Sequence, residues 1–234
     1  MNRHILFPVD FSQRSKELIP YIASITRKFN SKVTILHVLG PYEGLPGESE
    51  LVEVDWPHYQ DRLRERRESG LMDFVAGTFD NVNVTAVVDS GEPAERIIHY
   101  AAEHDVDLIM MATHGRGTFR KLLLGSVTSK VLHDSAYPVW TTAHTGMLAG
   151  LPRRDIQKVV CALDTASDGL RMLEATGDIA SVYGAEVAIV HAVPVPTVGF
   201  EPGLDNGFGL FLADTAKDLI AKLQRNAGTK WEVS

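Results

Sequence analysis

Short apolar runs alternate with helical spacings of apolar residues over the first 142 residues of the chain. Continuous apolar runs are typical of strands buried on both faces. The strands expected from these runs are 4–9, 33–38, 82–88, 107–112 and 138–142. Helices are expected near 12–29, near 57–77, from Pro93 onward and over 126–134. This alternation predicts an α/β fold, a doubly wound, Rossmann-like parallel sheet covered by helices on both faces.

The pattern returns at a spacing of 154 residues. Asp10 and Asp164 each follow an apolar strand, and His37 and His191 each end the next one. Further pairs at the same spacing are Ile25 and Ile179, Val33 and Val187, and Ile35 and Ile189. Agreement over two strands and the helix between them indicates a tandem duplication. We therefore expect two domains, 1–145 and 155–234, joined by a linker over 143–154.

The expected second copy is incomplete. Its predicted elements are a strand at 157–163, a helix near 166–183, a strand at 186–193, a loop at 194–209, a helix near 210–226 and the start of a strand at 230–233. The counterpart of Gly115 would fall beyond Ser234. The sequence alone leaves open whether the chain is a fragment of a longer tandem protein or a truncated gene product.

The net charge, the cysteine content and the lengths of the apolar runs exclude several kinds of binding partner and cellular location. The chain has 234 residues, a formal net charge of −7 and 44% hydrophobic residues. The negative charge argues against binding nucleic acid or an anionic membrane surface. The single cysteine, Cys161, excludes a disulfide within the chain and suits a reducing cytoplasm. No apolar run approaches the roughly 20 residues of a membrane span, and residues 5–9 are too short for a signal peptide. We expect a cytoplasmic protein.

The segment 111–126 carries the main candidate chemistry. A glycine-bearing loop leaves the strand 107–112 and returns at a helix start, Gly125-Ser126. Glycines let backbone amides approach an anion, and a helix N-terminus adds unpaired N–H groups. Cationic side chains are supplied by Arg116, Arg120 and Lys121. The segment forms either a phosphate cradle or only a tight turn before a helix, in which Ser126 caps the helix.

The spacing Ala112-x2-Gly115-x9-Gly125-Ser126 resembles the nucleotide loop of the universal stress protein family, Gly-x2-Gly-x9-Gly-(Ser/Thr). The first glycine of that pattern is Ala112 here. A methyl group still allows close ligand approach if φ is negative at this position. The resemblance spans 3–142 and implies ATP binding, with Mg²⁺ carried by the nucleotide. It also implies pairing through the last strand, 138–142, as a homodimer.

The resemblance further implies where the nucleotide lies. Asp10, in Pro8-Val9-Asp10, matches the aspartate of the family's site, and Val38 matches the valine that meets the adenine. The full set of implied nucleotide-binding residues is Pro8, Val9, Asp10, Val38, Met111, Ala112, Gly115, Arg116, Gly117, Gly125, Ser126, Val127 and Thr128. From the residues alone, Asp10 is either an N-cap of the following helix or a ligand for ribose hydroxyls or a metal.

Three functions follow in order of preference. The first is a cytoplasmic, ATP-binding stress or regulatory module, and the second is a family member that binds no nucleotide and acts through protein contacts. Ala112 favours the second function. The third is a weak ATPase, which needs a general base near the phosphates, and only Asp10 is an evident candidate. His114 lacks a nucleophile beside it in sequence, so we assign no catalytic residue.

Overall fold

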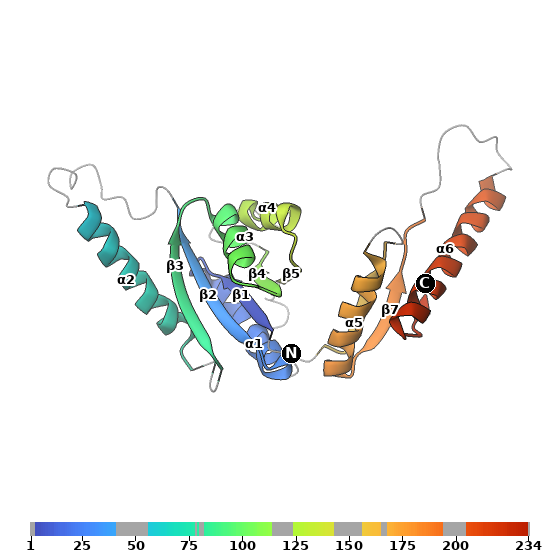
Figure 1. Cartoon of the computed structure of the whole chain (residues 1–234), viewed down its shortest axis with the longest axis horizontal. Coiled ribbons are helices and arrows are strands. Elements are labelled where there is room, and N and C mark those ends of the chain that lie inside the picture. Colours follow the sequence, from blue (N-terminus) through green and yellow to red (C-terminus); the bar gives the residue numbers. More distant parts are fainter. Residues whose placement is uncertain are drawn as a thin grey trace. The chain divides into compact units, whose positions relative to one another are not determined.

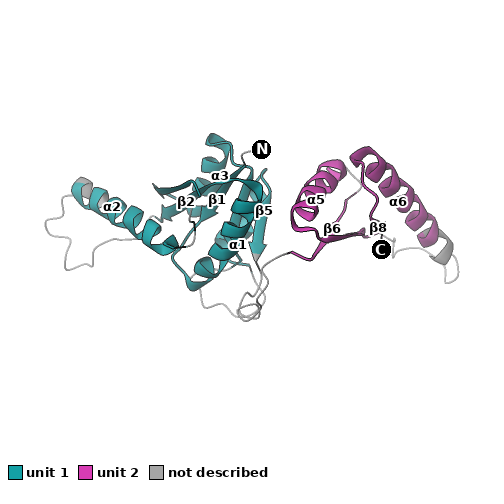
Figure 2. Ribbon diagram, turned by 90° about the horizontal axis from the view of Figure 1, so that it is seen from below, with its two compact units in different colours: residues 1–152 teal, residues 153–234 magenta. Residues whose placement is uncertain are grey.

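The computed structural model describes residues 3–40, 56–77, 79, 82–113, 124–142, 156–164, 168–193 and 205–233. Two compact units divide the chain, residues 1–152 and 153–234 (Figure 2). The division falls within the segment 143–154 that the sequence suggests as a linker. Each unit is described by itself.

Unit 1 is a five-stranded parallel sheet with helices on both faces, so the predicted doubly wound α/β fold is confirmed (Figure 1). Its elements are β1 (His4–Pro8), α1 (Gln13–Phe29), β2 (Lys32–Leu39), α2 (Trp56–Val75), β3 (Val84–Ser90), α3 (Pro93–Glu103), β4 (Leu108–Ala112), α4 (Ser126–Asp134) and β5 (Val139–Thr142). The strand order is β3-β2-β1-β4-β5. Its central strand, β1, pairs with β2 on one side and with β4 on the other.

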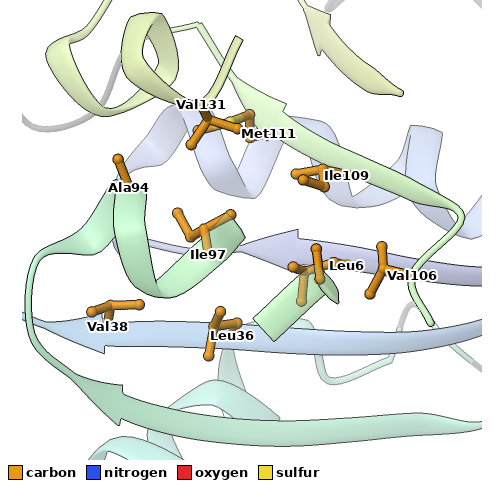
Figure 3. Close-up of a cluster of buried hydrophobic side chains, with 10 residues drawn as sticks. Leu6, Leu36, Val38, Ala94, Ile97, Val106, Ile109, Met111 and Val131 are labelled. Atoms are coloured by element: carbon orange, nitrogen blue, oxygen red, sulfur yellow. The ribbon is translucent and has the colours of Figure 1, made fainter. Parts of the chain in front are cut away.

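Apolar side chains from one face of the strands fill the space between the sheet and the helices α3 and α4. Leu6 on β1 and Leu36 on β2 are fully buried there against Ile97 of α3, and Val131 of α4 closes the same cluster (Figure 3). This cluster extends to the carboxyl ends of β2 and β4. The core therefore fixes where these strand ends lie.

The amino end of β1 is held by a buried histidine. The Nδ1 atom of His4 lies 2.9 Å from the carbonyl oxygen of His104, and its Nε2 atom lies 2.8 Å from the hydroxyl of Thr34. A carbonyl oxygen only accepts, so Nδ1 carries the proton and the neutral ring fits both contacts. Burial lowers the pKa of His4 below its usual value.

Unit 2 contains β6 (Lys158–Ala162), α5 (Gly169–Tyr183), β7 (Glu186–Val190), α6 (Asp205–Ala227) and β8 (Glu232–Val233). The strands are parallel in the order β6-β7-β8. Leu173 of α5 and Ile220 of α6 pack with Cys161 and Ile189 on one face of this sheet.

Contacts of unit 1 recur in unit 2 at the spacing of 154 residues. His37 Nδ1 donates to the Val9 carbonyl at 2.7 Å, and His191 Nδ1 donates to the Leu163 carbonyl at 2.7 Å. In the same way, the strand pair His4 with Lys32 recurs as Lys158 with Glu186. The first strand–helix–strand of unit 1 therefore has a counterpart in unit 2 with the same register.

The other face of the unit 2 sheet is exposed. Val160 and Val190 are 59% and 43% exposed, whereas their counterparts Leu6 and Leu36 are 0% exposed beneath α3 and α4. Within its described residues, unit 2 has no counterparts of these two helices.

The boundaries of several elements differ from those expected. α6 begins at Asp205, inside the predicted loop 194–209. Gly207 and Gly209 have low helix propensity and so favour a loop in the sequence, but they do not prevent a helix that packs on a sheet. β3 runs two residues past its expected end, to Ser90, because its ladder with β2 continues to the pair of Leu39 and Ser90.

Candidate functional site

The strand order of unit 1 reverses at β1, which lies between β2 and β4. In open parallel sheets, ligands bind outside the carboxyl ends of the strands at such a switch point. Asp10 follows β1, Val38 lies near the end of β2, and Ala112 ends β4. The fold thus brings three of the predicted site residues to one edge of the sheet.

The half-buried carboxylate of Asp10 is tied to the beginning of α1. Its Oδ1 atom accepts a hydrogen bond from the Ser12 amide at 2.9 Å and another from the Ser15 hydroxyl at 2.7 Å. The N-cap of α1 is Ser12, whose hydroxyl accepts from the Ser15 amide. Asp10 is therefore not the N-cap itself, although it stabilises the same turn. The partial positive charge at the start of α1 favours a carboxylate here.

The end of β4 is joined directly to the start of α4. The Gly125 amide donates to the Thr113 carbonyl at 2.8 Å, and the buried Thr128 hydroxyl donates to the Ala112 carbonyl at 2.9 Å. These two bonds hold the first turn of α4 beside the end of β4. Ser126, the first residue of α4, is exposed. A helix N-terminus held in this way is an anion-binding feature.

The backbone at Ala112 has the negative φ that close approach of a ligand to an alanine requires. The non-glycine residues with positive φ in the described part of the chain are Phe11, Asn30 and Asp105, so Ala112 has negative φ. Its backbone conformation therefore does not require glycine. The methyl group is the only obstacle that the substitution adds.

The apolar members of the predicted site lie in the core cluster. Val38 and Met111 are 7% and 5% exposed and pack in the same cluster, against which the half-buried Val127 packs (Figure 3). Pro8 is the half-buried last residue of β1, and Val9 is buried with its amide donating to the Leu36 carbonyl. These residues shape the strand ends, and little of Val38 or Met111 is left for contact with a base.

Three predicted residues, Gly115, Arg116 and Gly117, lie outside the described residues, as do Arg120, Lys121 and His114. What the structure does describe is both anchors of this segment, Thr113 before it and Gly125 after it.

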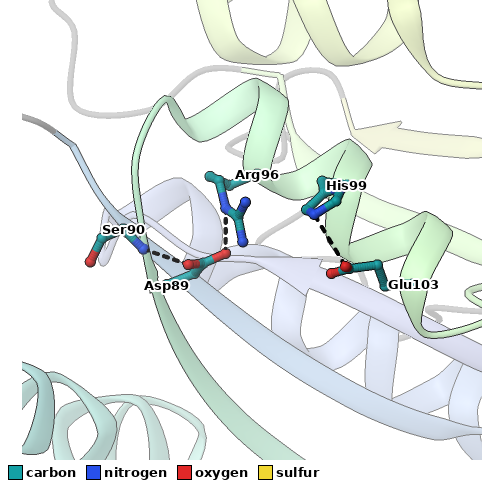
Figure 4. Close-up of polar contacts among 5 residues, drawn as sticks. All are labelled: Asp89, Ser90, Arg96, His99 and Glu103. Atoms are coloured by element: carbon teal, nitrogen blue, oxygen red, sulfur yellow. Dashed lines mark hydrogen bonds and ion pairs between the residues drawn. The ribbon is translucent and has the colours of Figure 1, made fainter.

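The Asp89 side chain of β3 and the Arg96 side chain of α3 form a contact that no sequence motif indicates. Asp89, paired with Val38 across β2 and β3, accepts a hydrogen bond from the Arg96 side chain at 2.7 Å (Figure 4). Gly91 precedes α3 with φ of 138°, where a Cβ would approach the Arg96 side chain at 3.1 Å. The segment Gly91-Glu92-Pro93 therefore needs glycine for its conformation.

No group of three or more possible metal ligands exists among the described residues. A divalent ion at this edge would therefore have at most two such side chains of the described residues as ligands, Asp10 being the predicted one, and would rely on oxygens of a bound ligand for the rest. None of the helices, as far as their residues are described, has the length and apolar character needed to cross a bilayer.

Known proteins match this arrangement. The model of the universal stress protein family matches residues 1–142. Universal stress protein MJ0577 of Methanocaldococcus jannaschii is 28% identical over 152 residues, which cover 59% of this chain and 93% of that protein. Its solved structure, 27% identical, covers 61% of this chain and 96% of its own, with a TM-score of 0.50. A universal stress protein of Methanothermobacter thermautotrophicus is 31% identical over 57% of this chain and 90% of its own length.

One solved structure matches both units. A universal stress protein from Archaeoglobus fulgidus covers 98% of this chain and 76% of its own, at 24% identity and a TM-score of 0.63. At this identity the likeness concerns the fold alone.

Proposed function

The chain belongs to the universal stress protein family, and from this premise we propose that unit 1 binds ATP, with Mg²⁺ carried by the nucleotide. The observation that carries the proposal is the pairing of a carboxylate after β1 with a helix N-terminus after β4, on adjacent strands at the switch point. Family resemblance supplies the identity of the ligand.

The proposed binding residues would contact different parts of the nucleotide. Asp10 is suited to accept hydrogen bonds from ribose hydroxyls, because its carboxylate is already oriented by Ser12 and Ser15. Gly125 and Ser126 at the start of α4 would hold phosphates through backbone amides and a hydroxyl. Val38 would limit the adenine end. The metal would be held chiefly by phosphate oxygens, with Asp10 as the protein carboxylate that contributes to it.

We assign a binding and regulatory role in a cytoplasmic stress response, and no catalytic role. Fast phosphoryl transfer requires positioned charges and an oriented nucleophile. Asp10, the carboxylate that follows β1, already accepts hydrogen bonds from the Ser12 amide and the Ser15 hydroxyl. The second candidate, a family member acting without nucleotide, is favoured by Ala112 and by the deep burial of Val38.

Calorimetric titration of the full chain with ATP, ADP and AMP, with and without Mg²⁺, tests the proposal. We expect saturable heat for at least ATP, and a marked loss in Asp10→Ala. Absence of heat for every adenine nucleotide would favour the second candidate.

We further propose that unit 2 is a second family copy and mediates pairing with another copy of the chain. Its edge strand β6 carries Val160, which is exposed where its counterpart Leu6 is covered. An open strand edge with an apolar face favours association. A second copy is a suitable occupant because the two-fold pairing of identical faces would cover both at once.

Sedimentation equilibrium tests this pairing. Val160→Asp should shift the dimer toward monomer, and Leu219→Asp, a change at a 45% exposed residue of α6, should not. A wild-type chain that is monomeric at all concentrations, or equal effects of the two variants, would contradict it.

A further inference from the structure

Phe11 has an unusual backbone conformation directly beside Asp10. Its φ is 60°, in the left-handed region. Asn30 and Asp105 also have positive φ, and asparagine and aspartate tolerate it through short polar side chains. A phenylalanine does not, and relative to its right-handed form the conformation is disfavoured roughly 5- to 30-fold. Such conformations persist only when surrounding contacts hold them.

The contacts that hold Phe11 come from β2 and α2. Its ring meets the ring of His37 edge-on at 4.8 Å between centroids, and that of Phe74 at 5.5 Å. The guanidinium carbon of Arg67 lies 5.5 Å from the Phe11 ring centroid. A Cβ built on Gly70 would lie 3.7 Å from the ring, at ordinary contact distance. Arg67, Gly70 and Phe74 follow helical spacing, so one face of α2 closes over the ring.

His37 also holds the other side of Asp10. Its Nδ1 donates to the Val9 carbonyl at 2.7 Å while its ring packs on Phe11. The residues before and after Asp10 are thus fixed by one side chain at the end of β2. The backbone around the carboxylate cannot rotate without breaking one of these contacts.

The positive φ of Phe11 sets the direction of the chain into α1. The next residue, Ser12, places its amide 2.9 Å from Asp10 Oδ1, and Ser15 adds a hydroxyl at 2.7 Å. A return of Phe11 to negative φ would carry both donors away from the carboxylate. We propose that Phe11 is a positioning residue for nucleotide binding, held in the left-handed conformation by its aromatic contacts so that Asp10 is oriented before the ligand arrives. This inference rests on the proposed function of the Asp10 edge.

A pair of substitutions separates this role from simple packing. Phe11→Ala and Phe11→Gly both remove the ring, but only glycine reaches positive φ without a steric cost from Cβ. If the backbone conformation is what matters, Phe11→Ala binds ATP roughly 5- to 30-fold more weakly than Phe11→Gly, which reflects the left-handed cost for alanine. A packing role predicts the reverse order or no difference, because glycine loses the same contacts and adds chain entropy.

Asn30→Ala is the matched control. Asn30 has φ of 49° at the C-cap of α1, the end of that helix remote from Asp10. Its replacement removes a left-handed residue from the same helix, and we expect lower thermal stability with unchanged ATP affinity. If Asn30→Ala weakens ATP binding as much as Phe11→Ala does, general destabilisation is the cause and the proposal is overturned.

Hydrogen exchange of the Ser12 amide in the nucleotide-free protein gives a second measurement. Its protection should fall more in Phe11→Ala than in Phe11→Gly, because the bond to Asp10 is lost with the turn. If the wild-type chain binds no nucleotide, the proposed function fails, and this exchange experiment still tests Phe11. Equal protection in the two variants would overturn the positioning role.

Discussion

Thr128→Val tests whether the junction of β4 and α4 positions the start of α4. Valine has nearly the shape of threonine, but it replaces the hydroxyl that donates to the Ala112 carbonyl at 2.9 Å with a methyl group. Thr128 is 4% exposed, so water cannot readily replace the lost donor. Loss of a buried hydrogen bond of this kind costs about 1–2 kcal/mol.

The substitution should also move the ligand site. A methyl group cannot sit as close to a carbonyl oxygen as a hydroxyl does, so the first turn of α4 must shift away from the end of β4. Gly125 and Ser126 lie in that turn. We therefore expect weaker ATP binding in addition to lower stability.

Thermal unfolding followed by circular dichroism gives the stability, and calorimetric titration gives the ATP affinity. A loss of about 1–2 kcal/mol corresponds to a fall in Tm of roughly 2–8 °C for a domain of this size. Thr128→Ser is the control, because it keeps the hydroxyl and loses only the methyl group. It should lose stability but retain ATP affinity. Equal affinities for Thr128→Val and the wild type would refute the reasoning.

Three further predictions follow from the same structure. Gly125→Val should weaken ATP binding about tenfold or more, because a branched side chain enters the phosphate position and valine is a poor N-cap. Ala112→Gly should leave ATP affinity unchanged or raise it slightly, and titration calorimetry compares the two variants. The pKa of His4 is lower in the folded chain than in the unfolded chain, so as the pH falls His4 is protonated in the unfolded chain before it is protonated in the folded one. The free energy of unfolding should therefore fall as the pH drops below about 6.5. His4→Gln should reduce this dependence of the unfolding free energy on pH, measured by urea titrations. Leu6→Ala should lower the free energy of unfolding by about 2–5 kcal/mol, and Val160→Ala, in a monomer, should lower it by less than about 0.5 kcal/mol. Similar losses for the two variants in urea unfolding would show that the two positions are equally covered.

Much of the fold follows from the sequence because burial imposes a regular pattern. Residues such as Leu6 and Leu36 lie in strands covered on both faces, so they occur in continuous apolar runs that predict a parallel sheet. The apolar run that ends near Ala112 and the pair Gly125-Ser126 likewise predict a strand end and a helix start, which the structure contains as β4 and α4.

Other parts of the site depend on contacts that no local sequence pattern indicates. The Arg96 side chain meets Asp89 across a turn, and the Thr128 hydroxyl meets a carbonyl sixteen residues away. The left-handed conformation of Phe11 is opposed by its own propensity and is imposed by neighbours on β2 and α2. The sequence also does not indicate that Val38 is nearly fully buried, because its exposure depends on how α3 and α4 pack on the sheet.

We propose that unit 1, and not unit 2, holds the nucleotide between the ends of β1 and β4. The most direct measurement is a titration of the isotopically labelled full chain with ATP and Mg²⁺, followed by the chemical shifts of backbone amides. We expect saturable shift changes at Asp10, Gly125, Ser126 and Thr128, with none at Asp164, the counterpart of Asp10 in unit 2. Shift changes centred on Asp164, or none at any of these amides at saturating ATP, would contradict it.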